Sequence, residues 1–143
     1  MMMEIKNILV PTNGSGVDEE VVKLACSLAR KSKAKVYAVH IIEVERSLPL
    51  DTQIDSKTDE ADRILTHAED AAVDADYEIE TDLLQSRDAG PAIVNEAVER
   101  KIDLIIMATT YKKAPGIPDL GKAVYYVLKE APCRVLLYRD SIS

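Results

Sequence analysis

The stretch Ile5-Lys6-Asn7-Ile8-Leu9-Val10, followed by Pro11-Thr12-Asn13-Gly14, decides the fold. Its aliphatic run predicts a buried strand over residues 5–10, and the asparagine and glycine that follow are typical of a turn. Ser15, with Asp18 three residues later, resembles the capped start of a helix. The next apolar residues recur at helical spacing and predict one face of a helix, formed by Val17, Val21, Leu24, Ala25 and Leu28.

The same alternation of strand and helix continues to the end of the chain. Four more strands are expected, over residues 36–42, 77–84, 104–107 and 134–138. Gly90-Pro91 is expected to open the third helix, because proline in a first turn needs no N–H group. Three further helix faces are formed by Ala61, Ile64, Leu65, Ala68 and Ala72, by Ile93, Val94, Ala97 and Val98, and by Val124, Val127, Leu128 and Ala131. This pattern predicts an α/β fold with a parallel sheet, right-handed crossovers and helices on both faces.

Length and composition fit a single domain over residues 1–143. The formal net charge of -7 argues against nucleic-acid and membrane partners, which need clustered Lys and Arg. No apolar segment is long enough for a signal peptide or a membrane span, so we expect a cytoplasmic location. Cys26 and Cys133 form no metal-binding or Cys-x-x-Cys pattern, and both are expected to be buried free thiols.

The loops after the first and fourth strands are the expected ligand-binding region. Open α/β sheets bind ligands beyond the carboxyl ends of their strands, where the strand order reverses. Two long loops are expected, over residues 43–56 and 109–119. Met107-Ala108-Thr109-Thr110-Tyr111, followed nine residues later by Leu120-Gly121-Lys122, keeps the spacing of a nucleotide-binding loop while most of the glycines are replaced.

Four separated segments resemble the universal stress protein family. They are Ile8-Leu9-Val10-Pro11-Thr12-Asn13-Gly14-Ser15, Val39-His40, Asp103-Leu104-Ile105-Ile106-Met107 and Ala131-Pro132-Cys133-Arg134-Val135-Leu136. The resemblance implies an adenine-nucleotide alpha-hydrolase-like fold, with a five-stranded parallel sheet in the order 3-2-1-4-5. It also implies a regulatory or stress-response role and a homodimer joined through the last strand.

The resemblance further implies where a nucleotide would lie. The family loop reads Gly-x-x-Gly, nine residues, then Gly-Ser or Gly-Thr, and these positions here hold Ala108, Tyr111, Gly121 and Lys122. The family's aspartate after the first strand is replaced by Asn13. By resemblance, Pro11 and Ile41 would lie beside an adenine. The candidate cofactor-binding residues are Pro11, Thr12, Asn13, Ile41, Met107, Ala108, Tyr111, Gly121, Lys122 and Ala123.

Tyr111 and Lys122 each allow two opposite effects. The Tyr111 ring either blocks the nucleotide site or stacks on a planar ligand, and we expect blocking, because a bulky side chain prevents close backbone approach. Lys122 either holds a phosphate at the start of the last helix or is repelled by the helix dipole into solvent, which we favour. We therefore expect weakened or lost ATP binding and no resident cofactor. The alternative is an ATP-binding switch that uses Lys122.

Catalytic and metal-binding groups are not identifiable. Ser15 and Thr12 have no recognisable base beside them, so we do not expect an enzyme. His40 is expected to be a packed structural imidazole and His67 an exposed one. The acidic run over residues 60–80 is expected to be a solvated helix face, and no metal site is predicted.

Overall fold

Strands and helices alternate along the described part of the chain. The computed structural model describes residues 4–109 and 121–139. The five strands form one parallel sheet in the order β3-β2-β1-β4-β5, which confirms the expected order 3-2-1-4-5. In chain order the elements are β1 (Asn7–Thr12), α1 (Asp18–Arg30), β2 (Lys35–Glu43), α2 (Asp55–Asp74), β3 (Glu80–Ser86), α3 (Ala89–Glu99), β4 (Leu104–Thr109), α4 (Lys122–Glu130) and β5 (Arg134–Arg139).

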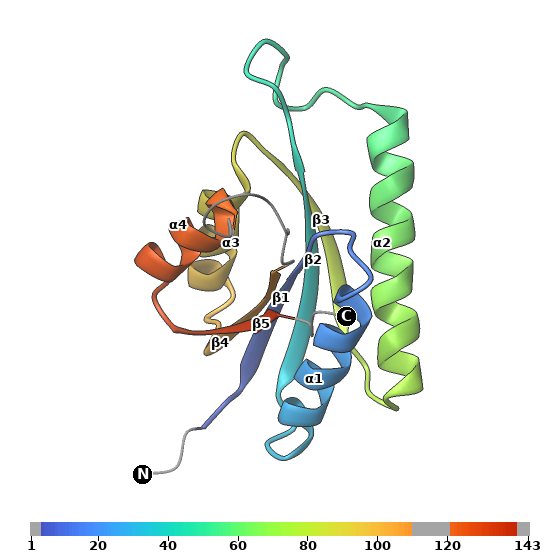
Figure 1. Ribbon diagram of the computed structural model, residues 1–143, viewed down its shortest axis with the longest axis vertical. Coiled ribbons are helices and arrows are strands. Elements are labelled where there is room, and N and C mark those ends of the chain that lie inside the picture. The colour runs from blue at the N-terminus through green and yellow to red at the C-terminus, as the bar shows by residue number, and fades with distance from the viewer. Residues whose placement is uncertain (1–3, 110–120, 140–143) are drawn as a thin grey trace, which may run out of the picture.

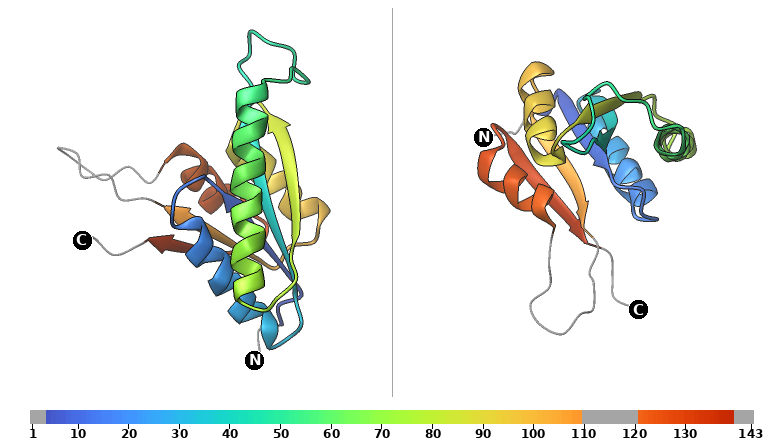
Figure 2. Two further views of the ribbon diagram at one scale, coloured as in Figure 1. Left: turned by 90° about the vertical axis from the view of Figure 1, so that its right-hand side faces the viewer. Right: turned by 90° about the horizontal axis from the view of Figure 1, so that it is seen from above.

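Helices cover both faces of the sheet. Figure 1 shows α1 and α2 on one side and α3 and α4 on the other, and the view from above in Figure 2 agrees. Successive residues of a strand point to opposite faces. Ile8 and Val10 therefore pack with α1 and α2, while Leu9 packs with α3 and α4. All three side chains are fully buried, which explains why this central strand has no polar alternation.

Most predicted strand boundaries differ from the structure by one to three residues, and two of the shifts have a clear cause. β1 continues to Thr12 instead of ending at residue 10, since its pairing with β2 extends to Thr12 and His40. β3 begins at Glu80 and not at residue 77. Tyr77 belongs to the turn after α2, where its N–H donates to the Ala72 carbonyl at 3.0 Å. Its hydroxyl donates to the Ala34 carbonyl. Tyr77, whose aromatic side chain favours a strand, therefore ends α2 and does not begin β3.

The predicted helix faces are wider than the surfaces that the structure covers. Val98 on α3 is 58% exposed and Leu128 on α4 is 47% exposed, although both lie on the apolar helix faces that the sequence predicts. Each lies one position after a buried residue, Ala97 or Val127, on the margin of its helix face. No helix in the two described ranges is long and apolar enough to cross a membrane.

Both cysteines are free thiols. Cys26 is fully buried in α1, as expected, whereas Cys133 is only half-buried just before β5. The prediction that both would be buried was therefore right for one of them.

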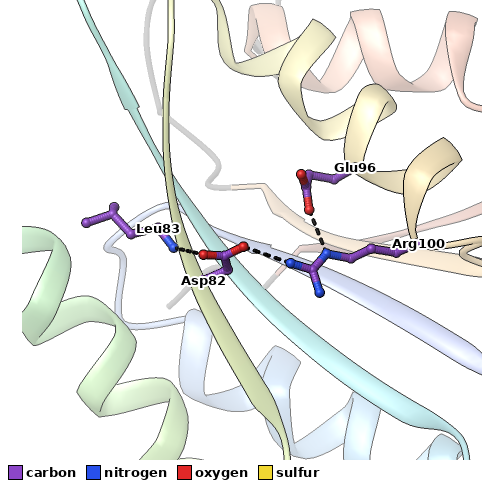
Figure 3. Close-up of polar contacts among 4 residues, drawn as sticks. All are labelled: Asp82, Leu83, Glu96 and Arg100. Carbon is purple, nitrogen blue, oxygen red and sulfur yellow. Dashed lines mark hydrogen bonds and ion pairs between the residues drawn. The ribbon is translucent and has the colours of Figure 1, made fainter. Parts of the chain in front are cut away.

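Arg100 ties the end of α3 to the neighbouring strands. Its Nη2 donates to the Asp82 carboxylate on β3 at 2.7 Å, and its Nε donates to Glu96 on α3 at 2.6 Å (Figure 3). The guanidinium also lies 4.7 Å from the centroid of the Tyr37 ring on β2. The hydrogen bond that Arg100 donates to the Glu96 carboxylate raises the pKa of Arg100 above its already high ordinary value. The planar guanidinium directs separate N–H groups at the two carboxylates and lies over the aromatic ring, which the compact ammonium group of lysine does not reproduce.

Gly90 allows α3 and α4 to approach each other closely. It lies in the first turn of α3, and a Cβ added there would be 2.8 Å from the Cβ of Tyr126 on α4. The obstructing atom belongs to the stem of the tyrosine, so a rotamer change cannot remove it. The contact sets the distance between the starts of these two helices.

We predict that Gly90→Ala destabilises the protein by about 1–3 kcal/mol, the usual cost of overpacking. Alanine in an ordinary helical position would instead stabilise it relative to glycine. The control is Gly16→Ala, because an added Cβ at Gly16 meets no atom within 4 Å. Urea unfolding of both variants measures the difference. A Gly90→Ala protein as stable as the wild type would contradict the close packing.

Candidate ligand pocket at the carboxyl edge of the sheet

The two central strands β1 and β4 separate before they reach the carboxyl edge of the sheet. β1 pairs with β2 along its whole length, but with β4 only at Ile8↔Leu104 and Leu9↔Ile105. Pro11 follows this point and has no N–H to offer a neighbouring strand. The strand order reverses between β1 and β4, and this is the position at which open parallel sheets bind ligands.

A pocket of about 540 Å³ opens at this edge. Its volume is within the range of small-molecule sites. Five segments far apart in the sequence form its wall: the turn after β1, the ends of β2 and β4, and the starts of α3 and α4. The lining residues are Asn13, Glu43, Asp88, Ala89, Gly90, Pro91, Met107, Ala108, Thr109, Gly121, Lys122, Ala123, Val124 and Tyr126.

The structure brings together most of the residues that the sequence nominated. Six of them line the pocket: Asn13, Met107, Ala108, Gly121, Lys122 and Ala123. Pro11 and Thr12 are instead buried within β1, and Ile41 is a half-buried residue at the border of the core under α3 and α4. Tyr111 lies outside the described residues, as does nearly all of the predicted loop over residues 109–119.

The sequence did not indicate the pocket residues that come from the end of β2 and the start of α3. Asp88 precedes α3, and Glu43 is the last residue of β2. One signal was present, because the connection from β3 to α3 also follows the carboxyl end of a strand. Gly90-Pro91 in the sequence predicts only a helix start, and α3 does begin one residue before Gly90.

Gly121 directs the start of α4 toward the pocket. It is the N-cap of the helix and has φ +94°, a conformation that is strained for residues with a side chain. This is the one glycine that survives from the four-position loop pattern. Ala108, by contrast, is a buried residue of β4 without a positive φ, and its side chain packs in the core beneath α1 and α2.

The charged groups of the pocket are mostly acidic. Its lining contains two carboxylates, Glu43 and Asp88, and one cation, Lys122. Arg46 pairs with Asp88 at 3.0 Å and partly balances its charge. Arg46 lies in the connection from β2 to α2, which projects beyond the end of the sheet (Figure 1).

Asp18 organises the turn between β1 and α1. Its carboxylate accepts hydrogen bonds from the N–H groups of Gly14 at 2.8 Å and Asn13 at 3.2 Å. Ser15 does not cap α1, since the N-cap position is Val17 and no side chain caps it. The expected capping role of Ser15 is therefore wrong, because the carboxylate of Asp18 reaches back to the turn from inside the helix.

Burial raises the pKa of Asp18 above its ordinary value, although the two backbone hydrogen bonds and the charge of His40 oppose this effect. The residue is only 5% exposed. His40 is half-buried at the end of β2, and its Nδ1 lies 3.2 Å from the hydroxyl oxygen of Thr12. That hydroxyl also donates to the carbonyl of Val39, so Thr12 has a structural partner.

Metal-binding geometry is absent from the described parts of the chain, where His, Cys, Asp and Glu form no group of three that could hold an ion. His67 is exposed on α2, as expected. Together, the sheet order and the pocket at its reversal point place the chain among the doubly wound α/β folds, in which the carboxyl edge of the sheet is the usual ligand-binding position.

Comparison with known proteins identifies the family. Residues 4–139 match the Universal stress protein family. A universal stress protein of Methanocaldococcus jannaschii is 31% identical over 140 residues, which cover 94% of this chain and 82% of that protein. The chain therefore belongs to the universal stress protein family, as its sequence motifs indicated.

Solved structures confirm the fold. The universal stress protein from Archaeoglobus fulgidus superposes with a TM-score of 0.78 at 25% identity, covering 92% of this chain and 97% of that one. A structure of the universal stress protein from Archaeoglobus fulgidus in complex with dAMP has a TM-score of 0.76 at 23% identity, covering 94% and 98%.

We predict that Asp18→Asn changes how stability depends on pH. The raised pKa means that the folded protein holds this proton to a higher pH than the unfolded chain does. The wild-type free energy of unfolding should then fall, relative to that of the variant, as the pH rises from the ordinary carboxyl pKa through the raised one. Urea unfolding from acidic to neutral pH measures this difference, with the exposed Glu19→Gln as control. A difference that grows in favour of the wild type over that range would contradict the prediction.

Proposed function

We propose that this protein is a dimeric regulatory module whose pocket binds adenine nucleotides weakly. The position of the pocket carries the proposal: it lies where β1 and β4 separate and where Asn13, Ala108 and Lys122 converge. A relative with the same fold has been solved with dAMP, which supports an adenine nucleotide as the ligand class.

The charges of the pocket support weak binding of polyphosphates. A triphosphate would meet the carboxylates of Glu43 and Asp88 together with the single ammonium group of Lys122. Attraction at an exposed helix start contributes on the order of 1 kcal/mol. Each backbone hydrogen bond to a phosphate that is lost with the glycines of the family pattern removes roughly 1 kcal/mol. The binding energy lost with these hydrogen bonds therefore exceeds the electrostatic attraction that Lys122 and the helix start supply.

A nucleotide switch that depends on Lys122 is the second candidate. The observation in its favour is that Lys122 lines the pocket at the first position of α4, where free N–H groups and the helix dipole also attract an anion. The two candidates differ in the expected affinity for ATP and in the share of that affinity that Lys122 supplies.

We predict that the wild type binds ATP, ADP and AMP weakly or not at all in calorimetric titrations with and without Mg²⁺. A variant with Asn13→Asp, Ala108→Gly, Tyr111→Gly and Lys122→Ser should bind ATP more tightly, because it regains a carboxylate and two glycines of the family pattern. Lys122→Ala is compared with Lys129→Ala, which removes the same charge from the last turn of the same helix, away from the pocket.

Tight binding of ATP by the wild type, lost in Lys122→Ala and kept in Lys129→Ala, would contradict weak binding and establish the switch. Equal binding by the wild type and the four-residue variant would contradict the role that we assign to the replaced loop positions.

The proposed dimer interface is at β5, which lies at one edge of the sheet. Val135 and Leu137 pack toward α3 and α4, but Leu136 points to the other face and is 36% exposed. An apolar side chain on an exposed edge strand favours pairing with a second copy.

We predict that the wild type is a dimer in light scattering at micromolar concentration and that Leu136→Glu shifts it to the monomer. The charge would be placed in the interface, where its desolvation is unfavourable. Val98→Glu is the control, because Val98 is an exposed apolar residue on α3, away from β5. A wild type that is monomeric throughout would refute this interface.

A further inference from the structure

Asn13 and Gly14 form the one Asn-Gly pair in the chain, which contains three asparagines in all. In such pairs the backbone nitrogen of the glycine can attack the side-chain amide of the asparagine, because glycine has no Cβ to hinder the approach. Asn13 is exposed, and Gly14 has φ +83°. A Cβ at Gly14 would lie 3.0 Å from Ile64, so the absence of a side chain is built into this turn.

The carbonyl group that would be attacked is polarised by the backbone. The Asn13 Oδ1 accepts a hydrogen bond from the N–H of Ser15 at 2.9 Å. A donor at this position stabilises negative charge on the oxygen when a nucleophile adds to the adjacent carbon. The bond also fixes the Asn13 side chain against its own main chain, in an Asx turn.

The attacking nitrogen is held by a carboxylate. The N–H of Gly14 donates to Asp18 Oδ2 at 2.8 Å, within the range required of a general base. Burial of Asp18 raises the pKa of its carboxyl group and so makes it a stronger base than an exposed aspartate. The proton acceptor and the oxyanion donor therefore belong to one turn.

We propose that Asn13 is a self-deamidation site, in which the turn from β1 to α1 supplies the nucleophile, the base and the oxyanion donor. The Gly14 nitrogen forms a bond to Asn13 Cγ and gives its proton to Asp18. The Cγ–Nδ2 bond breaks and the departing nitrogen takes up a proton. Ammonia is released, and a five-membered succinimide ring remains in the main chain. Water then hydrolyses either imide carbonyl, which yields aspartate or isoaspartate. Nothing is oxidised or reduced.

Deamidation would alter the pocket, because Asn13 lines it. The reaction adds a third carboxylate beside Glu43 and Asp88, and the isoaspartyl product lengthens the main chain at the turn. The chemistry does not require that the pocket bind a nucleotide, so its test is independent of the proposed function.

Peptide mass spectrometry of the purified full chain, incubated in neutral buffer, tests the proposal. Cleavage after Lys6 and Lys23 gives one peptide that contains both Asn13 and Asn7, which is followed by isoleucine. Conversion at Asn13 raises its mass by about one dalton, and fragment ions locate the change. We expect progressive conversion at Asn13, separable into aspartyl and isoaspartyl forms, with Asn7 and Asn95 unchanged.

The contribution of the fold is measured by comparing folded protein with the same chain in urea. We expect Asn13 to convert at least as fast when folded. Asp18→Ser, which removes the base without introducing another asparagine, should slow the folded rate by at least about tenfold. Glu19→Gln, an exposed carboxylate in the same helical turn, should leave the rate unchanged.

Protection of Asn13 in the folded protein, while the unfolded chain converts, would overturn the proposal. Equal rates in Asp18→Ser and the wild type would overturn the role of Asp18. The comparison of folded and unfolded wild type needs no variant, so the proposal stays testable if Asp18→Ser does not fold.

Discussion

The early separation of β1 from β4 is the constraint on which the pocket and its chemistry depend. Two residue pairs join these strands, while β1 stays paired with β2 to its end. Pro11 is compatible with this arrangement because it lies beyond the ladder with β4 and has no N–H to leave unpaired. Because the strand order reverses at the same place, the chain leaves β1 and β4 toward opposite faces of the sheet, and a space remains between them.

One contact remote from the pocket and one at its wall position the helices around it. The Arg100 guanidinium anchors α3 to β3 through Asp82 and stacks on Tyr37, while the absence of a side chain at Gly90 lets α4 pack against the first turn of α3. These contacts place two helix starts beside each other at the carboxyl edge. The packing of the helices therefore determines the width of the pocket. Its charge comes from Glu43, Asp88 and Lys122.

In the turn after β1, the same few residues stabilise the start of α1 and take part in the proposed reaction of Asn13. Asp18 is buried because it satisfies the N–H groups of Asn13 and Gly14, which would otherwise lack partners. The N–H of Ser15 donates to Asn13 Oδ1 in the same turn and holds the Asn13 side chain, which lines the pocket. The hydrogen bonds that stabilise the start of α1 therefore also determine the proposed reactivity of Asn13, which lines the pocket.

The sequence alone determined the alternation of strands and helices, because burial on one or two faces imposes a local periodicity that can be counted. Family motifs added the strand order and six of the pocket residues. Only the tertiary structure decided that Val98 and Leu128 are exposed, since periodicity shows which residues share a helix face and not how much of it a neighbour covers. Likewise, Glu43 and Asp88 reach the pocket through the packing of segments distant in sequence, and no local pattern encodes that approach.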